Sequence, residues 1–310
     1  MIQAEKLVKK FDEYTALNGI DCTIQKGCIY GMVGSNGAGK STFLRLITGV
    51  YRPDAGSVKV DGEEVFNNPA VKERMAFVPD DLYFLNGSTM DRMARCYKAA
   101  YPWFDDKRYR FLADSFRLTT NRPIHTFSKG MKRQTSIILA LSCRPDYMFF
   151  DETFDGLDPV MRNLVKGLIC EDVEEKQATA IITSHSLREL EDICDQLALL
   201  HEGGVVLESD VQNLKTGLFK VQVAFLEPFG EDRFAGMDVQ HFDQNGSVAR
   251  MIVRGNREET VARLRAMNPV ILDVLPLSLE EVFTYEMKAL GYSFQDVLGK
   301  EAGSDEKKAV

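Results

Sequence analysis

The sequence lacks any apolar run of about 18 residues, the minimum length of a membrane-spanning helix. We therefore expect no segment of this chain to cross a membrane. The first residues, MIQAEKLVKKFDEY, also lack the apolar core and small-residue cleavage site of a secretory signal. These two absences predict a protein that works in the cytoplasm.

Paired cysteines and metal-ligand spacings are missing as well. The six cysteines include no CxxC pair and mostly lie inside apolar runs, which predicts buried free thiols rather than disulfides or a metal site. Three of the four histidines, His125, His201 and His241, form no metal-binding spacing. The net charge of −8 and the pI of about 5.2 indicate that nucleic acid is not a partner.

Over about the first 210 residues, short β-rich runs alternate with helical patterns, which predicts α/β layers. The runs CIYGMVG, YMFFD and ATAIITS are continuously apolar, as in strands that are buried on both faces. An Asp61-Gly62 hairpin signal indicates an antiparallel β subdomain, and residues of about 85–145 form a helical, aromatic-rich subdomain. These features define a first domain of residues 1–215.

The residues after this domain predict a small α+β domain at 219–292. It contains an Asn245-Gly246 turn and a final helix that begins with a capping box of Ser278 and Glu281. The apolar stripe of that helix consists of Leu279, Val282, Phe283, Met287 and Leu290. Residues 293–310 are polar and are predicted to be a disordered tail.

The most specific motif is GSNGAGKST, which satisfies G-x-x-x-x-G-K-[ST] directly between a buried strand and a helix. Backbone N–H groups of such a loop curl around phosphate oxygens, Lys40 reaches the β- and γ-phosphates, and Ser41 binds Mg²⁺. The alternative is a glycine-rich structural turn. The nucleotide-binding residues predicted here are Gly34, Ser35, Asn36, Gly37, Ala38, Gly39, Lys40, Ser41 and Thr42.

Two carboxylates follow the buried strand YMFFD. Asp151 suits a Mg²⁺ shell, and Glu152 suits the positioning or deprotonation of an attacking water. A DE pair at a strand end can also be ordinary solvated charge, and the functional interpretation depends on the phosphate loop at the same sheet edge.

The stretch FSKGMKRQ places Lys129, Lys132 and Arg133 at the start of a helix that Ser128 caps. A helix N-terminus disfavours cations there by about 0.3–1 kcal/mol each, so the pattern predicts a nearby anion. Together with GLDP and TSHS, these motifs resemble the nucleotide-binding subunits of ABC transporters over about the first 210 residues. The resemblance implies a P-loop NTPase core, ATP and Mg²⁺ as ligands, and a second ATPase subunit.

In this family, the stretch that matches FSKGM is called the signature loop, and it faces the ATP of the other subunit in a head-to-tail dimer. The resemblance therefore implies that Ser128 and the backbone at Gly130 touch its γ-phosphate; the alternative is a simple helix cap. It implies that His185 is the family's switch histidine, which contacts the γ-phosphate and the attacking water. It also implies that Asp158 links the two sites across the dimer; the alternative for Asp158 is an Asp-Pro turn. The resemblance also implies that Phe11 stacks on the adenine; Tyr14 is the rival for this role, and either ring can instead serve in packing.

One residue departs from the family pattern. The family expects a glutamine after FVP, near Mg²⁺, where this chain has Asp80. A carboxylate is a competent Mg²⁺ ligand, but it is shorter by one methylene and adds negative charge beside the γ-phosphate. The predicted metal ligands are therefore Ser41, Asp151 and Asp80. Whether Asp80 contacts Mg²⁺ directly stays open.

The resemblance implies an ATPase on the inner face of the cell membrane that drives separate membrane-spanning permease subunits. The SKGM and SLEEVF stretches resemble exporter-type subunits. Aromatic residues of the helical subdomain belong to its core or line the groove for a permease helix. The alternatives are a soluble ABC-type ATPase without a transport role and an ATP-binding regulator whose site is inactive, for which Asp80 is the only argument.

Overall fold

The computed structural model describes residues 1–275, 277–289 and 291. The predicted tail and Leu290 lie outside the described residues. The chain forms two compact units, of which the first comprises Met1–Glu208 and the second begins at Ser209. The sequence-based boundary was residue 215, inside the second unit.

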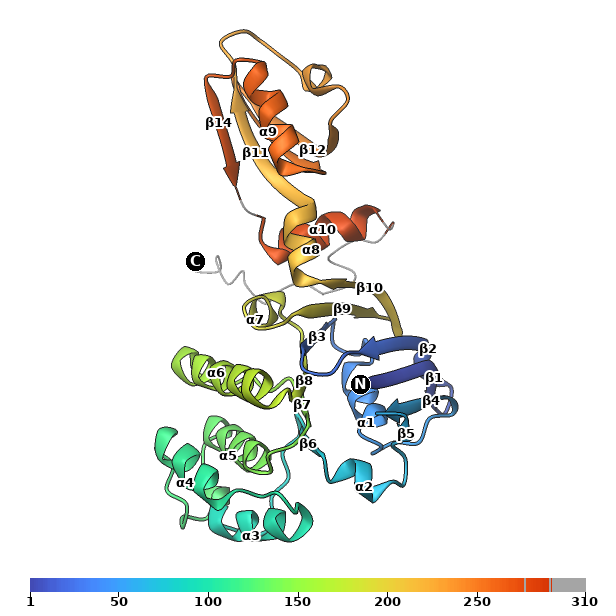
Figure 1. Ribbon diagram of the computed structural model, residues 1–310, viewed down its shortest axis with the longest axis vertical. Helices are drawn as coiled ribbons and strands as arrows, with labels where there is room; N and C mark the ends of the chain where they lie inside the picture. Colours follow the sequence, from blue (N-terminus) through green and yellow to red (C-terminus); the bar gives the residue numbers. More distant parts are fainter. Residues whose placement is uncertain (276, 290, 292–310) are drawn as a thin grey trace, which may run out of the picture. The chain divides into compact units, whose positions relative to one another are not determined.

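A six-stranded sheet forms the centre of the first unit, in the order β10-β9-β3-β8-β7-β6 (Figure 1). All pairings among β9, β3, β8, β7 and β6 are parallel. The three continuous apolar runs form β3, β7 and β8, and every residue of these strands is buried, as predicted. The strands are β3 (Ile29–Val33), β6 (Met75–Val78), β7 (Tyr147–Asp151), β8 (Thr179–Ser184), β9 (Gln196–His201) and β10 (Gly204–Asp210).

A second sheet in this unit has the order β2-β1-β4-β5, with antiparallel pairings. Its strands are β1 (Ile2–Phe11), β2 (Tyr14–Ile24), β4 (Ala55–Val60) and β5 (Glu63–Glu64). The predicted turn joins β4 to β5, where Asp61 has a φ of 52° and Gly62 a φ of 86°. Helix α1 (Lys40–Ile47) contacts β7 of the central sheet and β1, β2 and β4 of the antiparallel sheet, so it lies between the two.

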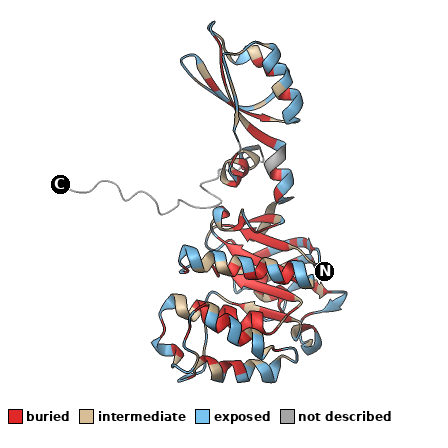
Figure 2. Cartoon of the chain, turned by 60° about the vertical axis from the view of Figure 1, so that its left-hand side comes forward, coloured by how far each residue is buried: buried red, intermediate tan, exposed pale blue. Residues whose placement is uncertain are grey.

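The other face of the central sheet is covered by α5 (Lys129–Ser142) and α6 (Pro159–Lys176), which contact β6 and β8 (Figure 1). Helix α6 is buried on one side only, whereas residues 133–142 of α5 are all buried; Figure 2 shows the strands of this sheet as buried. Helix α5 also packs against α3 (Met90–Ala100) and α4 (Asp106–Ser115), which form the helical subdomain with the 3₁₀ helix η1 (Ile124–Thr126). Short helices α2 (Pro69–Lys72) and α7 (Leu187–Leu190) complete this unit.

The aromatic residues of the helical subdomain divide between its core and its surface. Phe104 and Tyr109 are buried, whereas Trp103 and Phe111 are 72% and 62% exposed. The buried residues fit a role in the core of the subdomain, and the exposed ones fit a groove for a permease helix.

The second unit contains one antiparallel sheet in the order β12-β13-β11-β14. The capping box forms, since the N–H of Glu281 donates to Ser278 Oγ over 3.3 Å and the N–H of Ser278 to Glu281 Oε2 over 3.1 Å. The described members of the apolar stripe are all buried. The elements are α8 (Val211–Gly217), β11 (Leu218–Ala224), η2 (Glu231–Phe234), β12 (Asp238–Asn245), β13 (Val248–Arg254), α9 (Arg257–Ala266), β14 (Ile271–Leu275) and α10 (Leu279–Ala289).

The structure bears on two expectations from the composition, the lack of a membrane-spanning segment and the burial of the cysteines. None of the helices in the described ranges is long and apolar enough to span a bilayer. All six cysteines are free, but only Cys22, Cys143 and Cys194 are buried. The prediction of burial is wrong for Cys96, which is exposed because it lies on the outer side of the amphipathic helix α3.

Candidate active site

Four loops meet at one edge of the central sheet, because the carboxyl ends of parallel neighbouring strands point the same way. The phosphate loop follows β3, Asp80 lies just after β6, Glu152 follows β7 and His185 follows β8. The sheet thus brings four separately predicted segments together.

The phosphate loop ends in a helix whose N-terminus has no internal cap. The N-cap residue of α1 is Gly39, with a φ of 109° and no side chain to accept the first N–H groups, and no acidic residue lies in the first turn. A Cβ at this position would come within 2.6 Å of Leu17 Cδ2 and 2.8 Å of Ala16 O. Glycine is required there, and the helix start remains available to an anion.

Lys40 is the first residue of α1 and is only 5% exposed. Its ammonium donates to the carbonyl oxygens of Gly34 over 2.6 Å and Ser35 over 3.2 Å. It also lies 3.1 Å from Glu152 Oε1. The loop therefore wraps around the ammonium, and a carboxylate stands next to the cation that is predicted to bind phosphate.

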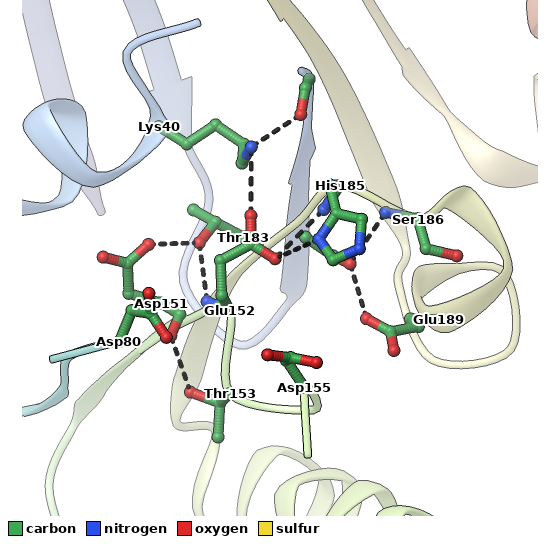
Figure 3. A network of polar contacts seen from close by, with 12 residues as sticks. Lys40, Asp80, Asp151, Glu152, Thr153, Asp155, Thr183, His185, Ser186 and Glu189 are labelled. Carbon is green, nitrogen blue, oxygen red and sulfur yellow. Dashed lines mark hydrogen bonds and ion pairs between the residues drawn. The ribbon is translucent and has the colours of Figure 1, made fainter. Parts of the chain in front are cut away.

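Glu152 joins Lys40 to His185 (Figure 3). Its Oε2 accepts the backbone N–H of His185 over 3.2 Å and lies 2.9 Å from the ring Nδ1. A carboxylate only accepts hydrogen bonds, so Nδ1 carries the hydrogen in this contact. Glu152 itself has a φ of 45°, an uncommon conformation for a residue with a side chain that often accompanies functional sites.

Asp151 is fully buried, and its Oδ1 accepts hydrogen bonds from Ser41 Oγ over 3.0 Å and Thr183 Oγ1 over 2.7 Å. Within the described part of the chain, its Oδ2 has no hydrogen-bond partner. An uncompensated buried carboxylate oxygen is costly. A serine hydroxyl beside a carboxylate with a spare oxygen fits Mg²⁺, which takes few protein ligands and completes its shell with waters and substrate phosphates.

Thr183 also belongs to the site, although it was not among the predicted site residues. In the sheet it pairs with Asp151, its hydroxyl donates to that carboxylate, and it accepts the N–H of Glu152 over 3.2 Å. Its position in TSHS, one residue before the end of a strand, was the available signal, but only the neighbouring strand turns it into a contact.

Ser128 caps α5, as predicted: its Oγ accepts the N–H of Met131 over 3.2 Å. The cation at Lys129 is matched within the same chain, since its ammonium lies 3.2 Å from Asp155 Oδ2. The hydrogen bond from Lys129 lowers the pKa of Asp155 below its usual range, so this carboxylate stays charged. The loop after β7 thus supplies one of the negative charges that the cations at this helix start require.

Gly130 approaches that same loop. A Cβ on Gly130 would lie 3.0 Å from the carbonyl oxygen of Gly156, which is tighter than most Cβ contacts in proteins, so the backbone would have to shift slightly. The close approach that glycine permits here is therefore to the chain's own backbone. The contact of Ser128 and Gly130 with a second subunit's nucleotide stays a prediction.

Arg133, the third cation of this helix start, is 1% exposed. Its Nη2 donates to Asp80 Oδ1 over 2.7 Å and its Nη1 to Pro79 O over 2.8 Å. Asp80, the residue that departs from the family pattern, is thus engaged with α5. Its role as a metal ligand stays a prediction.

Asp158 is the N-cap of α6, where its Oδ1 accepts the N–H groups of Val160 and Met161 over 3.0 Å each. This is the Asp-Pro start of a helix that the sequence allowed. A link between two sites across a dimer stays a prediction.

The two candidates for adenine stacking lie in different environments. Phe11 is 40% exposed, and its ring packs edge-on against Tyr51 with 5.6 Å between centroids. Tyr14 is 59% exposed and donates its hydroxyl to Gly37 O, in the phosphate loop, over 3.1 Å. Both rings retain exposed surface, and Tyr14 already has a bond to the loop.

We expect Phe11→Ala to weaken ATP binding about tenfold, because stacking of a base on an aromatic ring is worth about 1–3 kcal/mol. Tyr14→Phe, which removes only the hydroxyl, should change the dissociation constant less than about threefold. Calorimetric titration with ATP measures both. If Tyr14→Ala weakens binding tenfold while Phe11→Ala does not, Tyr14 is the stacking residue.

The geometry of the site defines the class of protein to which the chain belongs. A phosphate loop between a buried parallel strand and a helix, with an Asp-Glu pair at the end of a nearby strand, is the site of a P-loop nucleoside triphosphatase. A family model described as ABC transporter matches residues 17–155. The ABC transporter ATP-binding protein YtrB of Bacillus subtilis is 31% identical over 283 residues, covering 91% of this chain and 97% of YtrB.

The chain therefore belongs to the family of ABC transporter ATP-binding proteins and is an ATPase. The daunorubicin/doxorubicin resistance ATP-binding protein DrrA of Streptomyces peucetius is 31% identical over 225 residues, covering 70% of this chain and 67% of DrrA. A solved structure of an ATP-binding subunit of an ABC transporter is 25% identical, with a TM-score of 0.64 over 69% of this chain and 91% of that one. The predicted P-loop NTPase fold and family are confirmed.

Proposed function

We propose that this chain is the ATP-hydrolysing subunit of an exporter, and that it drives separate membrane-spanning subunits from the inner face of the cell membrane. The observation that carries the proposal is the contact between Glu152, Lys40 and His185 beside a phosphate loop. A binding-only regulator has no need for a carboxylate held between a phosphate-binding lysine and a histidine. That alternative rested on Asp80, whose carboxylate has a partner of its own on α5.

In the proposed hydrolysis, Glu152 is the general base or positions the attacking water. His185 holds Glu152 by two contacts and offers its remaining ring nitrogen to the γ-phosphate or the water. Lys40 binds the β- and γ-phosphates and offsets their negative charge. When bound by Ser41 and Asp151, Mg²⁺ supplies further neutralisation of the phosphate charge.

The proposed work step is closure of two such subunits, head to tail, around two ATP molecules. Ser128 is exposed at the start of α5, so a second subunit's nucleotide can reach the helix N-terminus. Lys132 adds a cation for which the structured part of the chain shows no ion pair. The triphosphate of a second subunit is the anion proposed for this helix start.

The permease is proposed to dock on the exposed aromatic residues of the first unit. Tyr83 follows the loop of Asp80 and is 80% exposed, and Trp103 in the helical subdomain is 72% exposed. Such side chains suit a groove for an amphipathic helix of a membrane protein. The export direction rests on the SKGM and SLEEVF stretches and on the resistance function in DrrA's name.

The test is purification of the tagged chain from detergent-solubilised membranes of its own organism. A multi-spanning membrane protein should co-purify, and the complex in vesicles should move substrate away from the side that carries this chain, only with ATP. The Glu152→Gln complex is the matched control without hydrolysis. Recovery of ribosomes or DNA in place of a membrane protein would contradict the transport role, and movement toward the ATPase side would contradict export.

A further inference from the structure

An ion pair joins the loop after β6 to the second turn of α5. Arg133 Nη2 lies 2.7 Å from Asp80 Oδ1, and Nη1 donates to Pro79 O over 2.8 Å. The two partners are buried very unequally, since the side chain of Arg133 is 1% exposed and that of Asp80 is 53% exposed. Arg133 is the largest of the fully buried side chains in the described residues.

A guanidinium cannot lose its proton in a protein, so burial leaves Arg133 charged. Removing such a charge from water costs several kcal/mol, which only a well-placed anion and further hydrogen bonds offset. The Nε of Arg133 has no hydrogen-bond partner among the described residues. The Asp80 carboxylate is therefore the anion in direct contact with the buried Arg133, and the carboxylate of Asp155 adds a weaker electrostatic interaction.

We propose that Arg133 and Asp80 act as one positioning pair that holds the start of α5 against the edge of the central sheet, and that this pairing, rather than contact with Mg²⁺, is what the carboxylate of Asp80 serves. The link to dimer closure rests on the proposed function. The pair itself does not, because both partners belong to one chain.

This pairing gives a physical reason for the departure from the family pattern. A glutamine after FVP would be neutral and would leave the buried guanidinium without a carboxylate in direct contact. The aspartate is shorter than glutamine by one methylene, but it reaches Arg133 over 2.7 Å. The residue that looked ill-suited to Mg²⁺ is well suited to an arginine.

The pair also connects two parts of the site. Asp80 follows β6, the neighbour of β7, which ends in Asp151 at the edge that carries the nucleotide loops. Arg133 lies four residues after the exposed Lys129 and five after Ser128, on the helix predicted to meet the second subunit. A shift of the loop at Asp80 is therefore transmitted to the start of α5 through a short charged contact.

The first experiment is a double-mutant cycle on the full chain without nucleotide. Thermal unfolding monitored by circular dichroism gives the melting temperature of each variant. Asp80→Asn should lower the melting temperature by about 5–10 °C, because it leaves a buried guanidinium unpaired. Arg133→Gln alone should lower it by less, since the freed carboxylate is half-exposed to water. Adding Arg133→Gln to Asp80→Asn should raise the melting temperature above that of Asp80→Asn.

This change of sign separates a charge pair from simple packing. If Arg133 only fills space, Arg133→Gln destabilises the chain in either background, and a further drop in the double variant would overturn the proposal. Lys132→Gln is the matched control, since it removes a neighbouring cation of the same helix without breaking an ion pair in the described structure. It should move the melting temperature by about 1 °C or less, and a drop equal to that of Arg133→Gln would also overturn the proposal.

The second experiment distinguishes anchoring from metal binding. In Asp80→Asn, kcat for ATP should fall about tenfold, the size of a typical coupling between sites. The dissociation constant of ATP should stay within about threefold, and the Mg²⁺ concentration for half-maximal activity within about twofold. A tenfold or larger shift in that Mg²⁺ concentration, with an unchanged melting temperature, would make Asp80 a metal ligand and overturn the proposal.

Discussion

Glu152→Gln is expected to lower the turnover of ATP by about 10²–10⁴-fold, the range that a positioned general base contributes. Glutamine keeps the size of the side chain and can still accept the N–H of His185, which the carboxylate now accepts over 3.2 Å. It cannot take a proton from water. Steady-state phosphate release measures the loss, and a variant that hydrolyses ATP at the wild-type rate would contradict the general-base role.

The Glu152→Gln variant is expected to retain bound ATP and to bind it more tightly than the wild type does. Glu152 Oε1 lies 3.1 Å from the Lys40 ammonium, where it competes with the phosphates for this cation. Removing the negative charge frees Lys40 for the nucleotide. Size-exclusion chromatography with Mg²⁺ and ATP should then show an accumulated dimer, and a strictly monomeric variant, even with its membrane partner, would contradict the closure model.

Glu189→Gln is the matched control for this variant. Glu189 lies on the short helix α7, which follows β8, and is buried to a similar degree, with its side chain 11% exposed against 14% for Glu152. It contacts Ser184 and Arg162 instead of the lysine and the histidine of the site. Its turnover should stay within about twofold of the wild type, so a general effect of losing a buried carboxylate can be separated from loss of the base.

The framework of the first unit was predictable because its signals are local. Fully buried parallel strands appear as uninterrupted apolar runs, and the phosphate loop is defined by consecutive residues. The meeting of Lys40, Asp151, Glu152 and His185 then follows from one fact about parallel sheets, that the carboxyl ends of neighbouring strands lie at the same edge.

The contacts of α5 were not predictable in the same way. The sequence showed three cations at an unfavourable helix start and required an anion, but it could not show that two of them are matched within the chain. Asp155 meets Lys129, and Asp80 meets Arg133 across a separation of 53 residues. One sequence carries no information on which loop packs against which helix, so these partners appear only when the chain is folded.

Gly130 illustrates the same limit. A glycine in a signature loop indicates a close approach by something, and the resemblance directed that expectation to a nucleotide. The structure adds a second reason that acts within the chain, since the carbonyl oxygen of Gly156 would lie 3.0 Å from a Cβ. Gly130→Ala is thus expected to disturb the fold locally as well as any contact with phosphate.

Lys40→Met is expected to weaken ATP binding by about 10- to 150-fold and to reduce hydrolysis below detection. Hydrogen bonds from a charged group contribute about 1.5–3 kcal/mol, which corresponds to that range of affinity. Methionine has a similar length, so the change removes charge more than volume from a position that is 5% exposed. Lys166→Met, which removes another largely buried ammonium on α6, 3.9 Å from Asp192, is the control and should bind ATP within about twofold of the wild type. Calorimetric titration measures both variants. Wild-type affinity in Lys40→Met would mean that the nucleotide does not occupy the loop around this lysine, and the assignment of the whole site would fail with it.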